Sequence, residues 1–317
     1  MIKSLPVFGI ISLKNVADSF HVDTRKLLQG GELIGTALVS QKYRELAAAF
    51  SVGRKRRFIR MAERGLLRCI SCFNGLRSGS WPPAAMPLSL KHGYTMGGEV
   101  PVVQCYLNDI KAGGLKWTPA SLWWNPGKIR RKVGYYGKTD LALYDALDHY
   151  PVRGKQLVIV GSETPWYECI AAEYGAAVMT IEYRKVVCTI PGLEVVTPEQ
   201  FAAHPRRFDA ALSISAIEHD GLGRYGDALD PDGDIRAMAD FKRLLKDGGI
   251  LFLSVPVGLD ALVWNAHRVY GRKRLPRLLE GWRILAAYDF HDAMLDKGPL
   301  GSFDNQPVFV LTPALRY

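Results

Sequence analysis

From Gln156 onward the chain alternates short apolar stretches with segments in which apolar residues recur at helical spacing. Short apolar runs bounded by turn residues predict buried strands, and strands that alternate with helices predict a mainly parallel sheet. The helices are expected at 139–150, 166–174, 234–245 and 260–270. The strands are expected at 156–160, 177–181, 194–196, 209–214, 250–255, 283–288 and 308–311. The pattern therefore predicts an α/β fold with a seven-stranded, mostly parallel sheet and helices on both faces.

The first part of the chain has a different pattern. Helical spacing occurs at 42–50 and 55–70, whereas 74–101 is rich in Gly, Pro and Ser and is expected to be irregular. Residues 1–135 are therefore predicted to form a mainly helical or irregular extension, and residues 136–317 the α/β domain. The positive charge also lies in the first part, because residues 1–150 hold 22 Lys and Arg against 10 Asp and Glu, and the rest holds 19 against 21.

The densest basic segment runs from Arg54 to Arg68 and has apolar residues between its charges. Such a helix is either a solvated surface or a contact with a membrane surface, an acidic substrate or nucleic acid, and these interpretations stay open. No apolar run approaches the roughly 18 residues that span a bilayer, and the five scattered cysteines are typical of reduced thiols. We expect a cytoplasmic protein that contacts the inner membrane surface only through this segment, if at all.

The loops after the first two predicted strands hold the candidate cofactor residues. In an open α/β sheet, ligands bind at the carboxyl ends of the strands, near the point where the strand order reverses. Gly161, Ser162 and Glu163 follow the first strand, where glycine allows a ligand to approach the backbone closely. Glu182 follows the second strand, 21 residues after Gly161, which is the spacing expected for an acid that accepts the ribose hydroxyls of an adenosine cofactor.

The loop after the fourth strand holds the candidate catalytic residues. Glu218, His219 and Asp220 stand in a row, and Arg224 follows among three glycines. A carboxylate or imidazole there is placed to act as a base, and the arginine to hold an anionic group. Ser215 is added to the cofactor set and Tyr225 to the substrate set. The spacing of the acids matches no metal-binding loop, so no metal is assigned.

A polar stripe follows the fifth strand. If 260–270 is a helix, Asn265 and Arg268 share one face and His267 and Tyr270 share another. These four residues are predicted to bind substrate beside the mouth of the cleft.

At these residues the chain resembles the family catalogued as domain of unknown function 268, which is itself similar to class I S-adenosylmethionine-dependent methyltransferases. The resemblance covers about 100–312 and is carried by Ile217-Glu-His-Asp-Gly-Leu-Gly-Arg-Tyr-Gly-Asp227, Leu229-Asp-Pro-Asp-Gly-Asp234, Leu245-Lys-Asp-Gly-Gly249, Val255-Pro-Val-Gly258 and Asn265-Ala-His-Arg-Val-Tyr-Gly271. It implies a Rossmann-like fold with an antiparallel last strand and S-adenosylmethionine as the cofactor. The loop Gly161-Ser162-Glu163 departs from the glycine-rich pattern of such sites.

Two functions are weighed. The first is methyl transfer from S-adenosylmethionine to an oxygen or nitrogen of a small, saccharide or lipid-linked acceptor. The alternative is a non-catalytic domain that binds an anionic glycan or a nucleotide-linked ligand in the same cleft. Because the basic residues lie away from the predicted cleft and no Asn-Pro-Pro-Tyr-like motif follows the fourth strand, a nucleic-acid substrate is not expected.

Overall fold

The computed structural model describes residues 82–110, 114–119 and 126–314, which all fall within one compact unit, Arg68–Tyr317. The helices expected at 42–50 and 55–70 and the basic segment from Arg54 to Arg68 lie outside the described residues. Within these ranges no helix is long and apolar enough to cross a membrane. The boundary expected at 135/136 and the cytoplasmic location both stay predictions.

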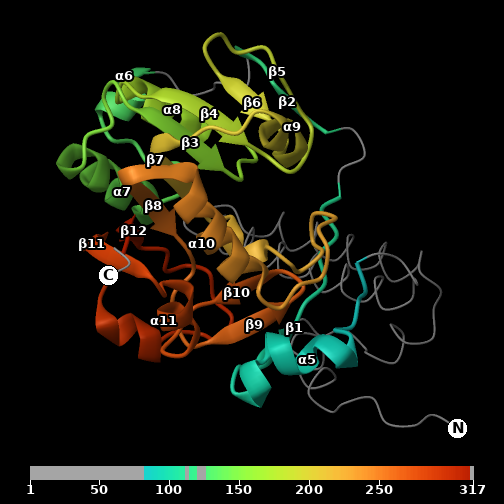
Figure 1. Ribbon diagram of the computed structural model, residues 1–317. Coiled ribbons are helices and arrows are strands. Elements are labelled where there is room, and N and C mark those ends of the chain that lie inside the picture. Colours follow the sequence, from blue (N-terminus) through green and yellow to red (C-terminus); the bar gives the residue numbers. More distant parts are fainter. Residues whose placement is uncertain (1–81, 111–113, 120–125, 315–317) are drawn as a thin grey trace, which may run out of the picture. The chain divides into compact units, whose positions relative to one another are not determined.

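A seven-stranded sheet forms the centre of the described chain (Figure 1). Its strands, in spatial order, are β11 (Trp282–Tyr288), β12 (Val308–Pro313), β8 (Leu245–Ser254), β7 (Phe208–Ile214), β3 (Gln156–Val160), β4 (Ala177–Ile181) and β6 (Glu194–Val196). β12 runs antiparallel to both its neighbours, and the remaining pairs are parallel. The predicted seven strands and the antiparallel last strand are confirmed. This order, with a reversal between β3 and β7, is a Rossmann-like arrangement.

Alternating side chains of the central strands supply two apolar layers. On one face, Leu157 and Ile159 of β3 pack with residues of α7 (Lys138–His149) and α8 (Trp166–Glu173). On the other face, Val158 packs with residues of α10 (Gly233–Leu244) and α11 (Arg274–Leu278). Because successive side chains of a strand point to opposite faces, one short strand contributes to both layers. The prediction of helices on both faces is confirmed.

A smaller sheet contradicts the helix expected at 260–270. The segment forms β9 (Ala261–Trp264) and β10 (His267–Val269), which pair with each other antiparallel, and β9 pairs in parallel with β1 (Val102–Gln104). All four residues of β9 and all three of β10 are buried. A short run buried on all sides has no helical or strand periodicity to distinguish the two, so the prediction was wrong for a physical reason.

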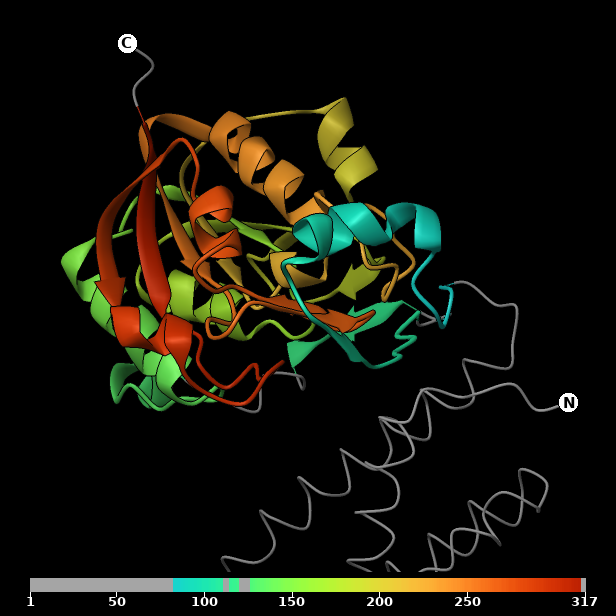
Figure 2. The ribbon, with the colours of Figure 1, turned by 90° about the horizontal axis from the view of Figure 1, so that it is seen from below.

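Several further elements lie around this core. The segment expected to be irregular contains α5 (Leu88–Tyr94), which is followed by the 3₁₀ turn η1 (Met96–Gly98). β2 (Leu115–Trp117) pairs in parallel with β5 (Val186–Cys188), and α9 (Pro198–Ala203) begins with a capping box at Thr197. Figure 2 shows α5 at one side of the described part and β11 with β12 at the other. The described chain is completed by α6 (Pro126–Arg130) and the 3₁₀ turns η3 (Ile217–His219) and η4 (Asp292–Asp296).

Candidate functional site

The candidate site lies where the parallel strands β3, β4 and β7 end. Their last residues, Val160, Ile181 and Ile214, lie at the same edge of the sheet because the three strands run in parallel and in register. The loops that follow bring Gly161, Glu182 and Glu218 to this edge. The structure therefore gathers the predicted cofactor loops and the predicted catalytic loop on one side of the domain.

Gly161 is required by the backbone of the first loop. It has a φ of 77°, which lies in the left-handed region that favours glycine, and a Cβ there would lie 2.6 Å from the Ala216 Cβ. Its N–H donates to the carbonyl of Ile181. The loops after β3 and β7 thus touch at Gly161, directly beside the end of β4.

Glu182 ties the first two loops together. Its Oε2 accepts the backbone N–H of Ser162 at 2.8 Å, and its Oε1 accepts the backbone N–H of Arg184 at 3.0 Å and the Arg184 Nε at 3.1 Å. Its side chain is only 6% exposed. Glu163, by contrast, is exposed, and its carbonyl accepts the indole N–H of Trp117 on β2. Glu182 therefore joins the loop after β4 to the loop after β3 that carries Ser162 and Glu163, whereas Ser215 contacts Glu218 and Tyr136.

Glu168 is a second buried acid behind the same loop, and the sequence analysis did not select it. It lies on α8, its Oε1 accepts the hydroxyl of Thr180, and no hydrogen bond to its Oε2 is found within the described ranges. Burial raises the pKa of Glu168 to about 7. The signal in the sequence was its position one turn before the buried Ala171, on the face of α8 that packs on the sheet.

Glu218 and His219 lie in η3, directly after β7. Glu218 is 1% exposed, and its Oε1 accepts the hydroxyl of Ser215 at 2.7 Å. Burial raises the pKa of this carboxyl to about 7. Ser215 has a φ of 51°, so an uncommon backbone conformation directs the chain from β7 into this turn.

His219 is held as a neutral imidazole. Its Nδ1 donates to the carbonyl of Ala266 at 2.6 Å, and its Nε2 lies 3.5 Å from Glu218 Oε1. Burial and the charge of Arg224 hold the pKa of His219 well below its ordinary value. With the proton on Nδ1, the Nε2 lone pair is available to accept a proton.

Arg224 and Tyr225 continue this loop. Arg224 donates from Nε to Asp109 at 2.7 Å and from a terminal nitrogen to the carbonyl of Ala266 at 3.3 Å. The ring of Tyr225 lies edge-on to His219, with centroids 5.6 Å apart, and the guanidinium carbons of Arg184 and Arg224 lie 5.1 and 4.9 Å from its centre. The structure thus brings the predicted residues His219, Arg224 and Tyr225 into one cluster.

Asp220 differs from its two neighbours in sequence. It lines a cavity of about 630 Å³ between α9 and α10, together with Asp230 and Arg236. Burial, with the charge of Asp227, raises the pKa of the Asp220 carboxyl well above its ordinary value. The catalytic role predicted for it stays a prediction, and the geometry places its side chain in this cavity.

The residues expected to bind substrate from a helix lie instead in the turn before β10 (Asn265), on β10 (His267 and Arg268) and directly after it (Tyr270). Asn265, fully buried, accepts the N–H of Leu107 at 2.8 Å and donates to the carbonyl of the same residue at 2.9 Å. His267 donates from Nε2 to the carbonyl of Gly301. Tyr270, also fully buried, donates to Asp234 at 3.0 Å. Because the predicted helix is wrong, these side chains share no helical face.

Arg268 holds the loop after β7 in place. It is 2% exposed and donates to the carbonyls of Asp220 at 2.6 Å and Asp230 at 3.1 Å. Its Nε lies 3.7 Å from Asp234 Oδ1. These contacts favour a positioning role for Arg268, Asn265 and Tyr270, whose assignment to substrate stays a prediction.

Tyr136 is a candidate that the sequence analysis missed. Its hydroxyl lies 3.2 Å from Ser215 Oγ and accepts the amide of Gln306 at 3.2 Å. Asp140 on α7 accepts the N–H groups of Tyr135 and Tyr136, which fixes the approach of this tyrosine to the edge of the sheet. The Gly-Tyr-Tyr-Gly run before a helix was the available signal.

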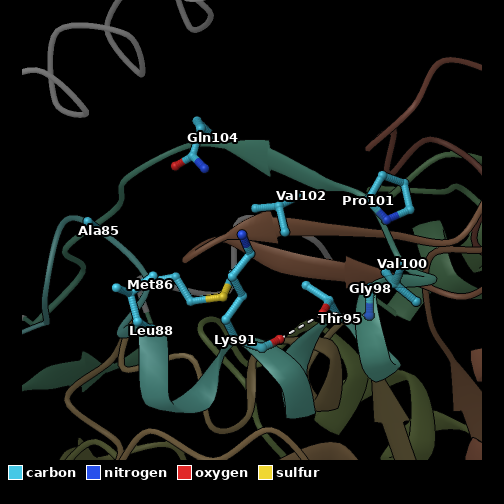
Figure 3. Close-up of a pocket in the computed structure, with 10 residues that line it drawn as sticks. All are labelled: Ala85, Met86, Leu88, Lys91, Thr95, Gly98, Val100, Pro101, Val102 and Gln104. Carbon is cyan, nitrogen blue, oxygen red and sulfur yellow. Dashed lines mark hydrogen bonds between the residues drawn. The ribbon is translucent and has the colours of Figure 1, made fainter. Parts of the chain in front are cut away.

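We assign no metal to this site, and a further cavity lies apart from its residues. The described residues contain no group of three or more His, Cys, Asp or Glu placed to hold a metal ion. A cavity of about 480 Å³ lies against α5 and β1, and Figure 3 shows Met86, Lys91 and Val102 among the side chains around it. None of the predicted site residues lines it.

Comparison with known families assigns part of the chain. Residues 154–297 match the family described as Caenorhabditis protein of unknown function, DUF268. The chain contains a DUF268 domain. The matched range of this domain includes Gly161, Glu182, Glu218 and His267. No curated protein matches the chain.

The solved structures similar to this chain include methyltransferases. One is the 1,6-didemethyltoxoflavin-N1-methyltransferase of Burkholderia thailandensis with bound S-adenosylhomocysteine, at 16% identity, a TM-score of 0.43, and coverage of 57% of this chain and 80% of that one. Another is a methyltransferase from Mesorhizobium loti, at 15% identity, a TM-score of 0.35, and coverage of 54% and 97%. A third is the ribosomal protein L11 methylase of Lactobacillus delbrueckii, at 13% identity, a TM-score of 0.37, and coverage of 57% and 81%. At these scores the fold assignment rests on the strand order itself.

Proposed function

We propose that the α/β domain is an S-adenosylmethionine-dependent methyltransferase whose acceptor is a small, saccharide or lipid-linked molecule. The observation that carries the proposal is the position of Glu182. A buried carboxylate follows the second strand, touches the backbone of the loop after the first strand, and lies at the edge where the strand order reverses. In sheets of this topology an acid at that place accepts ribose hydroxyls.

The residues present fit an adenosine cofactor at Glu182, which offers carboxylate oxygens to hydroxyl donors. S-adenosylmethionine, when bound, supplies a methyl group on a positively charged sulfur. The exposed carboxylate of Glu163 in the first loop is of the sign that attracts such a charge.

The catalytic loop can receive the proton that leaves the acceptor. A hydroxyl or amine acceptor loses a proton as it takes the methyl group, and His219 Nε2 is an unprotonated nitrogen. The Glu218 carboxyl, 3.5 Å away, stabilises the resulting imidazolium when it is ionised. Ser215 and Tyr136 continue the hydrogen bonds from Glu218 toward the exposed surface.

The test is titration calorimetry of the full chain with S-adenosylmethionine and S-adenosylhomocysteine. We expect micromolar binding to the unmodified protein and at least tenfold weaker binding to Glu182→Gln, which keeps the size of the side chain but removes its charge. Glu194→Gln is the matched control, because Glu194 is an exposed acid on β6 paired with Arg206. If the folded protein binds neither compound, the proposal fails and a non-catalytic domain for an anionic glycan or nucleotide-linked ligand takes its place.

A further inference from the structure

Arg184 hydrogen-bonds to the carboxylate that is proposed to bind the ribose of the cofactor. It lies two residues beyond Glu182, and its side chain is 11% exposed. Both its backbone N–H and its Nε donate to Glu182 Oε1, at 3.0 and 3.1 Å. The guanidinium therefore covers the oxygen that faces away from Ser162.

The hydrogen-bonding capacity of Glu182 is nearly used up by the protein itself. An ionised carboxylate offers about four acceptor positions, and Glu182 already receives three donors. A ribose presents two hydroxyl donors, so both are accepted only if one existing donor leaves. The N–H groups of Ser162 and Arg184 belong to the backbone, whereas the Arg184 Nε belongs to a flexible side chain. The guanidinium is the donor that can move.

Other partners are within reach of the guanidinium. A terminal nitrogen of Arg184 lies 3.7 Å from Glu163 Oε1, and the guanidinium carbon lies 5.1 Å from the centre of the Tyr225 ring. The same nitrogen is buried and has no hydrogen-bond partner in the part of the chain that the structure describes. Movement away from Glu182 toward Glu163 would exchange one charge-assisted hydrogen bond for another.

We propose that Arg184 is a gate on the cofactor site. In the absence of ligand its guanidinium hydrogen-bonds to the Glu182 carboxylate and blocks it. When ribose hydroxyls bind, the guanidinium moves toward Glu163 and Tyr225. The inference rests on the proposed function and adds to it a residue that sets cofactor affinity. The guanidinium of Arg184 lies over the ring of Tyr225, and this ring packs edge-on against His219. Movement of Arg184 therefore links an occupied cofactor site to the loop after β7.

The experiment is calorimetry of the full chain with S-adenosylhomocysteine and with adenosine, using Arg184→Ala and Arg184→Met. Removing the gate is expected to tighten binding of both compounds roughly tenfold. The gain should shrink for 2′-deoxyadenosine, which presents one hydroxyl fewer, and should vanish in the double variant Arg184→Ala with Glu182→Gln. Arg130→Ala is the control, because Arg130 of α6 is exposed and pairs with Glu173, and it should leave affinity unchanged.

The outcomes test the gate and the methyltransferase proposal separately. Weaker or unchanged binding by the Arg184 variants overturns the gate and leaves the methyltransferase proposal standing. Tighter binding by the Arg184 variants than by the unmodified protein supports both. If thermal unfolding shows folded proteins and no variant binds either compound, both are overturned. Arg184→Met keeps the apolar packing of the side chain, and it serves as the test if Arg184→Ala does not fold.

Discussion

Gly161 and Ala216 approach each other so closely that a Cβ on the glycine would lie 2.6 Å from the Ala216 Cβ. The two residues follow β3 and β7, the strands between which the order of the sheet reverses. Their contact brings the loop that carries Ser162 and the turn that carries Glu218 to the same place. The absence of one side chain therefore allows the candidate site to assemble.

We predict that Gly161→Ala destabilises the protein by about 2–5 kcal/mol, because it combines a left-handed backbone with a steric clash. Gly154→Ala is the matched control, since Gly154 has a φ of 73° and no atom of the described chain lies within 4 Å of the position that its Cβ would take. It should cost only about 1–2 kcal/mol, the backbone part of the effect. Urea unfolding of both variants gives the difference. Equal losses in the free energy of unfolding would show that the structure accommodates the added methyl group beside Ala216 without a loss of stability.

The large sheet could be predicted from the sequence because its strands are short apolar runs separated by turn residues. The predicted strand at 156–160 matches β3, and that at 177–181 matches β4. The small sheet could not be predicted, because β9 and β10 are buried on all sides and β9 pairs with β1, about 160 residues away in sequence. Pairing over that distance leaves no local signal.

The candidate site was predictable only to the level of which loops form it. Glu182 and Glu218 could be selected because they directly follow predicted strands. Glu168 and Tyr136 could not, because their approach to the edge depends on how α8 and the turn before α7 pack against the sheet. The partners of Arg268 come from a loop more than 30 residues away, so its positioning role was also beyond local pattern.

Substitution of Arg268 is predicted to lower the free energy of unfolding more than most single substitutions. Arg268→Met keeps the apolar stem of the side chain but leaves the carbonyls of Asp220 and Asp230 and the Asp234 carboxylate without a buried cation. Removing one partner of a buried charge typically costs about 3–5 kcal/mol. Denaturant unfolding should show a loss of this size.

The matched control is Arg272→Met, because Arg272 is exposed and pairs with Asp292 and Asp296 at the surface. Exposed ion pairs contribute little to stability, so this variant should unfold close to the unmodified protein. A similar loss in the free energy of unfolding in both variants would mean that the Arg268 contacts do not stabilise the fold more for being buried.

The two buried acids at the site predict how stability depends on pH. Burial raises the pKa of Glu168 and of Glu218 from 4.5 to about 7. A carboxyl whose pKa is higher in the folded state than in the unfolded state stabilises the fold below pH 4.5, and this contribution is lost as pH rises through 7. Each group should therefore lower the free energy of unfolding by about 3 kcal/mol between pH 4 and pH 8.

Glu168→Gln tests this directly, because glutamine stays uncharged and its amide oxygen can still accept the Thr180 hydroxyl. We expect the variant to gain stability relative to the unmodified protein as pH rises from 4 to 8, when urea unfolding is measured at each pH. Glu199→Gln should show the opposite direction, because the Thr197 hydroxyl and a backbone N–H lower the pKa of that exposed carboxyl. A constant difference between Glu168→Gln and the unmodified protein across this range would mean that Glu168 keeps an ordinary pKa in the folded state.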